Sequence, residues 1–348
     1  MAAEGPVQDR PEVRIDRSDV GRRVSVRRLS GFADDHRPVF RDVIGVLTSW
    51  DDGGLTVEPK AGGPVSFDER LLVAGKPVPL FPARRAPLPR TGPAELQRIA
   101  ARGWPAVERE PLGEWTLRAS AGFTRRANSV QALGDPGMPL DRALTTAREW
   151  YAARGLPAWV EVTTPGTPEA LRAELDRLGA AYAPTLVRVA GLAPLSRLGD
   201  RAGRDRVRLA RTASSDWMSL YRRVSGDPAV EEAARAVVHG GPSVWFATVH
   251  DGYGCQAEGD GTPPVLAIGR CVVDGPWACF SAVEVAPWAR RRGLATAVMA
   301  VLAARAAEEG ATGAYLQVEA DNAGAIALYD GLGFTTSHTY HYALLPQG

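Results

Sequence analysis

The alternation of β-like runs with amphipathic helical stretches constrains the fold of this chain most, and it occurs twice in succession. One copy reaches the tripeptide Leu178-Gly179-Ala180 and the other reaches Leu332-Gly333-Phe334, each between a helical stretch and a β-like run. Strands that alternate with helices predict an α+β fold with a mixed sheet. The recurring tripeptide indicates two related units of one fold, which we expect over residues 95–200 and 201–348.

The residues before these units follow a different pattern. Short β-like runs at 24–26, 43–47, 55–57 and 71–73 are separated by turn residues, and Asp51-Asp52-Gly53-Gly54 is a strong hairpin signal. Several strands within about 60 residues, with no helical stretch, predict a small β-barrel over residues 19–80.

Connecting segments are expected on both sides of this barrel. Residues 1–18 are polar and predict a flexible N-terminus. Residues 81–94 combine several prolines with Arg84, Arg85 and Arg90, which predicts a stiff, basic linker.

Overall charge limits the partners. The 348 residues include 41 Lys and Arg against 40 Asp and Glu, a formal net charge of +1. This balance gives no general attraction for a polyanion, so it argues against nucleic acid as the partner. No stretch approaches 18 apolar residues and the N-terminus lacks a signal-peptide pattern, so we expect a soluble, cytoplasmic protein without a membrane partner.

The cysteines and histidines do not indicate a metal. Cys255, Cys271 and Cys279 include no Cys-x-x-Cys pair, which argues against both a disulfide framework and a thiolate zinc site. His338 and His341 lie three residues apart on a predicted strand and should face opposite sides, which argues against a chelate.

The most informative segment runs from Val283 to Ala295 and predicts a strand, a short loop and the start of a helix. Unpaired N–H groups and the positive end of the helix dipole make such a helix start suitable for a phosphate or pyrophosphate. Gly293 and Ala295 lack bulk, so a ligand can approach their amides closely.

Charge placement on the same helix provides a second argument. Arg290, Arg291 and Arg292 precede its positive end, and Glu308 and Glu309 occupy its negative end. A charge of the same sign as the adjacent end of the helix dipole destabilises an isolated helix by about 0.3–1 kcal/mol. A bound polyanion would make the charge of the arginines favourable at this helix end. It would not explain why the glutamates lie at the negative end. The alternative is a solvated basic turn before an ordinary amphipathic helix.

A further helical face lies later in the chain. Asn322, Ala325 and Tyr329 fall on one side of a predicted helix, because seven residues make nearly two turns. An amide, a small residue and a phenol in this order can line a narrow channel. The alternative for Tyr329 is a core aromatic residue whose hydroxyl reaches the surface.

Taken together, these segments resemble the GNAT superfamily of N-acetyltransferases over residues 207–345. The family signature Gln/Arg-x-x-Gly-x-Gly/Ala after the fourth strand is matched by Arg290-x-x-Gly293-x-Ala295. The asparagine, tyrosine and Gly-Phe that follow in the family are matched by Asn322, Tyr329 and Gly333-Phe334. The resemblance implies a GNAT fold for this unit.

The earlier segments resemble two other modules. The unit at 95–200 resembles a degenerate GNAT copy, because its loop contains Asp135 where the family has basic or neutral residues, and Leu175 stands in the place of Tyr329. We expect no nucleotide there. The front segment resembles a Src-homology-3-like (SH3-like) barrel of the kind found ahead of some bacterial GNAT enzymes.

The resemblance implies transfer of an acetyl group from acetyl-CoA to a primary amine by direct attack on the thioester, without a metal. Tyr329 would donate its proton to the departing thiolate, and Glu284 or a water chain would take a proton from the amine. The alternative for Glu284 is a structural charge at the strand edge, because strand alternation can equally point its side chain away from the cleft. Val283 and Val285 would pair with the pantetheine like an added strand, and the N–H of Val285 would polarise the thioester carbonyl.

The acetyl-CoA-binding residues that the resemblance implies lie on the strand, the loop and both helices. The amides from Arg290 to Thr296 would hold the pyrophosphate, and Asn322 would contact the pantetheine arm. The full set is Val283, Val285, Arg290, Arg291, Arg292, Gly293, Leu294, Ala295, Thr296, Asn322 and Ala325.

Two other functions are compatible with these residues. A non-catalytic acyl-CoA-binding regulator would need the arginine loop but not Tyr329. A docking barrel, together with the linker arginines, would bind a protein partner or RNA, and the near-zero net charge argues against RNA. In the leading hypothesis the acceptor is a small-molecule or peptide amine.

Overall fold

The computed structural model describes residues 13, 15–33, 36–78, 88–178, 184–198, 204–221, 226–251 and 263–346. The chain divides into two compact units, Met1–Pro82 and Ala83–Gly348. Most of the predicted N-terminal segment, the linker residues Arg84 and Arg85, Gly179-Ala180 and Cys255 lie outside the described residues.

The first unit is a five-stranded antiparallel sheet in the order β4-β3-β2-β1-β5. Its strands are β1 (Arg23–Phe32), β2 (Pro38–Asp51), β3 (Gly54–Pro59), β4 (Val65–Asp68) and β5 (Leu72–Pro77), with the short helices η1 (Arg17–Asp19) and η2 (Glu69–Leu71). The predicted hairpin turn joins β2 to β3. There Asp52 and Gly53 adopt φ values of 45° and 76°, as a tight hairpin requires.

The core of this unit comes from alternate residues of its strands, including Val24, Val26, Leu47 and Val57. The predicted run of strands is thus present, together with β4, which the sequence analysis did not include. Within the described residues, β4 and β5 are the outermost strands and do not pair with each other. The five strands therefore form a sheet whose closure into a barrel is not shown.

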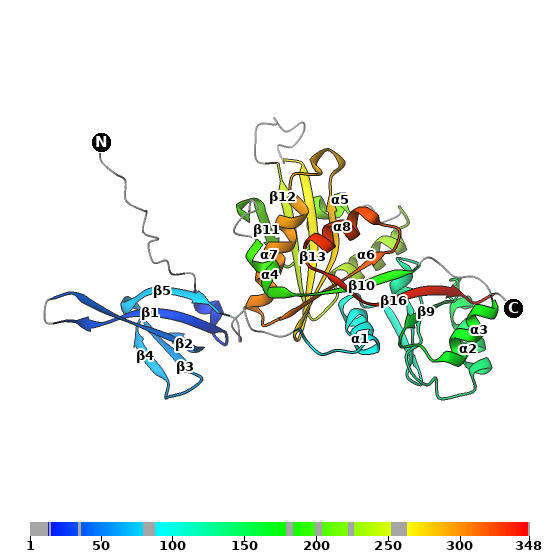
Figure 1. Cartoon of the computed structure of the whole chain (residues 1–348), viewed down its shortest axis with the longest axis horizontal. Coiled ribbons are helices and arrows are strands. Elements are labelled where there is room, and N and C mark those ends of the chain that lie inside the picture. Colours follow the sequence, from blue (N-terminus) through cyan, green and yellow to red (C-terminus); the bar gives the residue numbers. More distant parts are fainter. Residues whose placement is uncertain are drawn as a thin grey trace. The chain divides into compact units, whose positions relative to one another are not determined.

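The second unit contains one sheet of 11 strands in the order β11-β12-β13-β14-β15-β10-β16-β9-β8-β7-β6. Figure 1 labels β9 to β13 and β16 of this sheet. The strands are β6 (Glu108–Leu112), β7 (Trp115–Ala119), β8 (Val130–Gln131), β9 (Trp159–Thr164), β10 (Thr185–Gly191), β11 (Val207–Ala210), β12 (Ser243–His250), β13 (Val265–Asp274), β14 (Trp277–Val285), β15 (Gly313–Glu319) and β16 (Thr335–Leu344). The helices are α1 (Pro93–Gly103), α2 (Leu140–Ala152), α3 (Glu169–Leu178), α4 (Leu192–Leu198), α5 (Ser215–Leu220), α6 (Pro228–His239), α7 (Leu294–Glu308) and α8 (Ala323–Gly331), with short turns η3 (Arg125–Ala127), η5 (Arg204–Arg206) and η6 (Pro287–Ala289). The predicted mixed α+β sheet is confirmed.

The last strand of each half lies within the other half. β10, which ends the first half, pairs with β15 of the second half over Thr185–Gly191. β16, which ends the chain, pairs with β9 of the first half over Thr339–Leu344. Because β10 and β16 also pair with each other, the two halves share a single sheet.

Each half also contains a parallel strand pair, β8 with β9 and β14 with β15. This similarity supports the interpretation of two related units. The expected boundary at residue 200 stays a prediction, and it falls between halves that are joined by exchanged strands.

Helices cover both faces of the second half of the sheet. On one face α7 packs across β12, β13 and β14 and against α4. Gly269 permits this approach, because a Cβ at that position would come within 2.4 Å of Val298. Neighbouring residues of a strand point to opposite faces, so Arg270 lies on the other face, where α1 packs on Trp277 and Tyr315.

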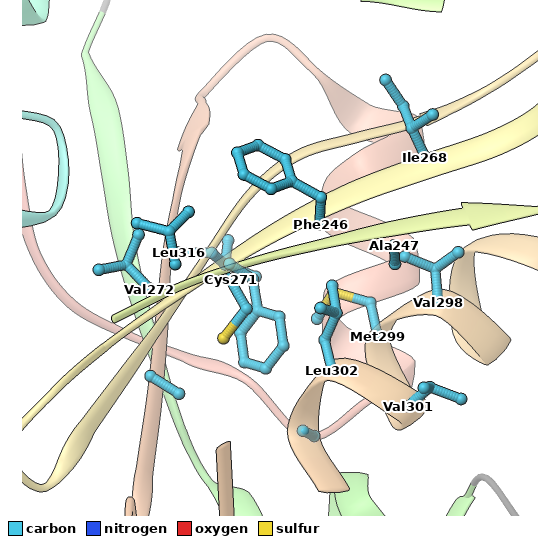
Figure 2. Packing of buried hydrophobic residues seen from close by; sticks show 14 of the residues in the cluster. Phe246, Ala247, Ile268, Cys271, Val272, Val298, Met299, Val301, Leu302 and Leu316 are labelled. Carbon is cyan, nitrogen blue, oxygen red and sulfur yellow. The ribbon is translucent and has the colours of Figure 1, made fainter. Parts of the chain in front are cut away.

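The apolar sequence of α7 explains its central position. Alanine, leucine and methionine are strong helix formers, and the helix buries residues on most of its sides. Figure 2 shows Val298, Met299 and Leu302 of α7 packed among side chains of the sheet. Within the described ranges, no helix has both the length and the apolar character needed to span a bilayer.

Candidate active site

The parallel strands β14 and β15 pair along only part of their length. Pairing extends from Trp277 with Gly313 to Phe280 with Leu316 and then stops. We call this point the strand split. Beyond it β14 continues to pair with β13, through Glu284 and Val285, so its other edge has no strand partner within the described residues.

A backbone irregularity accompanies the strand split. Ala282 adopts a φ of 50°, and the register between β13 and β14 shifts at this point. Such a bulge bends a strand and re-aims the groups that follow it. Val283, Glu284 and Val285, the predicted strand residues of the site, are all half-buried on the bent segment.

The loop after β14 presents unpaired N–H groups at the start of α7. Gly293 is the N-cap residue, with a φ of 75° that favours glycine, and no described side chain caps this helix end. Arg290, Arg291 and Arg292 are exposed, and none forms an ion pair with a described residue. This helix start therefore combines open amides with positive charge.

The remaining predicted loop residues divide into two groups. Ala295 and Thr296 are half-buried on the first turn of α7. The side chain of Leu294 packs in the hydrophobic core, so only its backbone is available to a ligand. This arrangement agrees with a site built from backbone amides.

The matching loop in the first half is occupied by its own acids. Glu114 Oε2 accepts a hydrogen bond from the amide of Asp135 at 2.6 Å, and Asp135 Oδ1 accepts one from the amide of Gly137 at 2.8 Å. The indole of Trp115 donates to the carbonyl of Gly134 at 3.0 Å. The first two bonds satisfy loop amides and place two carboxylates ahead of α2, whose first turn, like that of α7, has no side-chain cap. The negative charge of these carboxylates disfavours an anion in this loop.

The glutamates at the far end of α7 have partners that explain their position. Glu309 accepts hydrogen bonds from Ser243 Oγ and Trp245 Nε1, each at 2.6 Å, and pairs with Arg305 at 3.3 Å. Burial opposes ionisation, but the two hydrogen bonds and the arginine hold the pKa of Glu309 below its usual value. Glu308 pairs with Arg305 at 2.9 Å. Within the part of the chain that the structure describes, the three arginines at the other end of α7 have no ion-pair partner.

Helix α8 begins at Asn322, whose Oδ1 accepts a hydrogen bond from the amide of Ala325 at 3.1 Å. None of its residues is buried, although most of its sequence is apolar. Tyr329 is half-buried and packs edge-on against Phe334, with ring centres 5.8 Å apart. Within the described residues its hydroxyl has no hydrogen-bond partner, and burial raises the pKa of Tyr329 to about 12.

Several polar residues at the strand split were not predicted from the sequence. Ser281 and Gln317 are the first residues past the last paired positions of β14 and β15. Arg270 is fully buried and reaches Ser281 Oγ at 3.3 Å, and Tyr340 donates to Gln317 Oε1 at 2.6 Å. A charged residue within the apolar run 265–273 was the available signal for Arg270. Burial lowers its pKa to about 10, which still leaves it charged at neutral pH.

No cluster of metal-ligating side chains accompanies these residues in the described parts of the chain. His338 is 3% exposed, whereas His341 is half-buried, in accordance with their predicted placement on opposite faces of β16.

Comparison with known proteins gives the same family as the sequence motifs. A family model described as "Probable histone acetyltransferase Rv0428c C-terminal" matches residues 94–343. The "Uncharacterized N-acetyltransferase YobR" of Bacillus subtilis is 28% identical over 254 residues, which cover 72% of this chain and 97% of that protein. The "Probable histone acetyltransferase Rv0428c" of Mycobacterium tuberculosis is 33% identical over 150 residues, or 41% of this chain and 44% of that protein.

The fold is similar to that of a solved GCN5-related N-acetyltransferase from Kribbella flavida. The TM-score is 0.51 at 16% identity, covering 74% of this chain and 97% of that one. The predicted GNAT fold is thereby confirmed. Since the family model spans well over half of the sequence, the chain belongs to the Rv0428c C-terminal family of GNAT-type N-acetyltransferases.

Proposed function

We propose that this acetyltransferase moves the acetyl group of acetyl-CoA to a primary amine at the strand split. The observation that carries the proposal is the uncapped start of α7, fronted by three exposed arginines and adjacent to the unpaired edge of β14. A diphosphate fits the first feature, and the extended amide chain of pantetheine fits the second.

Each part of the cosubstrate would meet a different set of residues. The amides from Arg290 to Thr296 would hold the pyrophosphate, with the arginine side chains adding charge. Val283 and Val285 would pair with the pantetheine, and the apolar surface that α8 leaves partly exposed would cover its other side. Asn322, by capping α8, would fix the position of that helix, and Ala325 would leave room for the arm.

The reaction itself requires one bond to form and one to break. The nitrogen of a neutral amine attacks the thioester carbon, the C–S bond then breaks, and the products are an acetamide and the free thiol of CoA. The N–H of Val285 would stabilise the negative charge on the carbonyl oxygen. Tyr329 would protonate the departing thiolate, and its high pKa keeps it protonated at neutral pH.

The amine must lose a proton before it attacks. For an alkylamine with a pKa of about 10.4, forming the neutral species at pH 7.4 costs about 4 kcal/mol. Glu284, on the segment of β14 beyond the split, would accept this proton directly or through a water chain.

Replacement of all three loop arginines by glutamine is expected to weaken acetyl-CoA binding. Exposed charges near a helix start contribute about 0.3–1 kcal/mol each, so the dissociation constant should rise by about 5- to 150-fold. Isothermal titration calorimetry measures this change. The matched control is Arg142→Gln at the exposed start of α2 in the first half, which should have no effect. Unchanged affinity in the triple variant would contradict the assignment of the loop.

A further inference from the structure

Two arginines flank the strand split on the face covered by α1, and each is connected to a polar residue at the split. Arg270 Nη1 lies 3.3 Å from Ser281 Oγ. Arg126 Nε lies 3.4 Å from the hydroxyl of Tyr340, which in turn donates to Gln317 Oε1 at 2.6 Å. The first half of the chain, through η3, thus supplies a cation to the split in the second half.

The guanidinium groups of both arginines lie near the ring of one tryptophan, Trp104. The guanidinium carbon of Arg126 lies 5.8 Å from the ring centre of Trp104, and that of Arg270 lies 5.0 Å from it. Trp104 is 5% exposed, and its indole N–H donates to Thr124 Oγ1 at 3.1 Å, which fixes the ring. Both contacts have the range of cation–π interactions.

Neither arginine has an acidic partner within the described residues. Elsewhere in the same sheet, the buried Arg118 pairs with Glu161 at 2.8 Å. The donors of Arg270 are instead used by the carbonyls of Val238 and Gly240 and by Ser281. Among the described residues, the hydrogen bond of Arg126 is the long one from its Nε to Tyr340, which leaves its two Nη groups available to a ligand.

Arg126 is also partly exposed, unlike Arg270. A second polar atom nearby has no hydrogen-bond partner among the residues that the structure describes: Tyr342 Oη is buried, and the Tyr342 ring packs edge-on against that of Tyr340, with ring centres 5.5 Å apart. The α1 face of the strand split therefore presents a partly exposed cation without an acidic partner among the described residues, beside a buried hydroxyl whose unmet hydrogen bond has a cost.

We propose that the amine acceptor carries a carboxylate and that Arg126 binds it, placing the amine at the strand split. This inference rests on the proposed acetyl transfer at that point. The planar guanidinium fork matches a carboxylate with two parallel hydrogen bonds. The same positive field opposes polycationic acceptors such as polyamines and lysine-rich peptides.

The first test uses the unaltered enzyme and matched acceptors. Rates of CoA release are measured with free L-amino acids, with the corresponding amino amides, with spermidine and with a lysine-rich peptide, each corrected for its fraction of neutral amine. Loss of one hydrogen bond to a charged group lowers kcat/KM by about 10- to 100-fold, so the free acids should exceed the amides by this factor. Equal rates for acids and amides, or a preference for the cationic acceptors, would overturn the proposal.

The second test assigns the effect to Arg126. Arg126→Gln should reduce kcat/KM for the free acids to the level of the amides while leaving acetyl-CoA affinity unchanged, and Arg126→Lys should restore part of the preference. The control is Arg125→Gln in the same turn, because its guanidinium lies over Trp159, 5.6 Å from the ring centre, and the preference should persist. A preference that survives in Arg126→Gln would overturn the role of this residue.

Failure of the underlying function gives a different result. If calorimetry shows no binding of acetyl-CoA, or if no amine of any class releases CoA, the proposed acetyl transfer is wrong and this inference is overturned with it. Release of CoA with cationic amines alone would leave the acetyl transfer intact and reject only the carboxylate acceptor.

Discussion

Replacing Tyr329 by phenylalanine is expected to lower kcat by about 10²- to 10⁴-fold, the range attributed to a positioned general acid. The ring would still pack against Phe334, so the fold and the affinity for acetyl-CoA should change little. Because the hydroxyl has no partner among the described residues, its removal breaks no local hydrogen bond. The measurement is single-turnover CoA release together with calorimetric affinity.

The control for this variant removes a phenol from the first half. Tyr151 is fully buried, and its hydroxyl donates to the carbonyl of Arg118 at 2.9 Å and accepts from the amide of Arg118 at 3.1 Å. Tyr151→Phe leaves these buried backbone groups without that partner, so it should reduce the free energy of unfolding by about 1–3 kcal/mol and leave kcat unchanged. If Tyr329→Phe retained full turnover, the tyrosine would have no part in the chemistry, and a role for the chain as an acyl-CoA-binding regulator would gain support.

Separating the two halves of the second unit is expected to abolish folding of both. A fragment of residues 201–348 would lose β10, which pairs with β15 and β16, and a fragment of residues 88–200 would lose β16. Each lost backbone hydrogen bond costs about 0.5–1.5 kcal/mol, so a missing central strand removes stability comparable with the whole net value of about 5–15 kcal/mol. Circular dichroism and size-exclusion chromatography of the fragments, alone and co-expressed, measure this dependence.

Removal of residues 1–82 provides the contrasting case. That segment is a compact unit with its own core, so a chain of residues 83–348 should unfold cooperatively and bind acetyl-CoA. A folded monomer of residues 201–348 that binds acetyl-CoA would contradict the importance of the exchanged strands.

The exchange of β10 and β16 also connects the first half to Tyr329, the proposed general acid. Arg188 on β10 donates to the carboxylate of Asp330 at the end of α8 and to the carbonyl of Phe334. These bonds hold the helix that contains Tyr329 against a strand from the other half. The first half therefore contributes to the site through its last strand, although its own loop is closed by Glu114 and Asp135.

The local parts of this architecture were predictable from sequence. The strand, the arginine loop and α7 follow one another within a short segment. The helix start requires a positive φ at residue 293, and the glycine in the sequence indicates this conformation. Asn322 and Tyr329 could be placed on one helix by counting turns. In these cases neighbouring residues determine the structure.

The non-local parts were not predictable. Exchange of β10 and β16 joins residues about 150 positions apart, and no periodicity within either strand specifies its partner. Arg126 lies in a short turn with no distinctive pattern, and only the fold brings it beside Tyr340. The sequence likewise did not indicate that residues of β12 donate hydrogen bonds to Glu309. The position of this glutamate at the end of α7 was therefore unexplained.

The most direct test of the account is the number of acetyl-CoA molecules bound per chain. Calorimetric titration of the full-length protein should give one site, because exposed arginines precede the uncapped start of α7, whereas the carboxylates of Glu114 and Asp135 lie in the matching loop of the first half and repel an anion. That site should disappear or weaken strongly in the triple arginine variant. Absence of binding, or two equivalent sites per chain, would contradict the account.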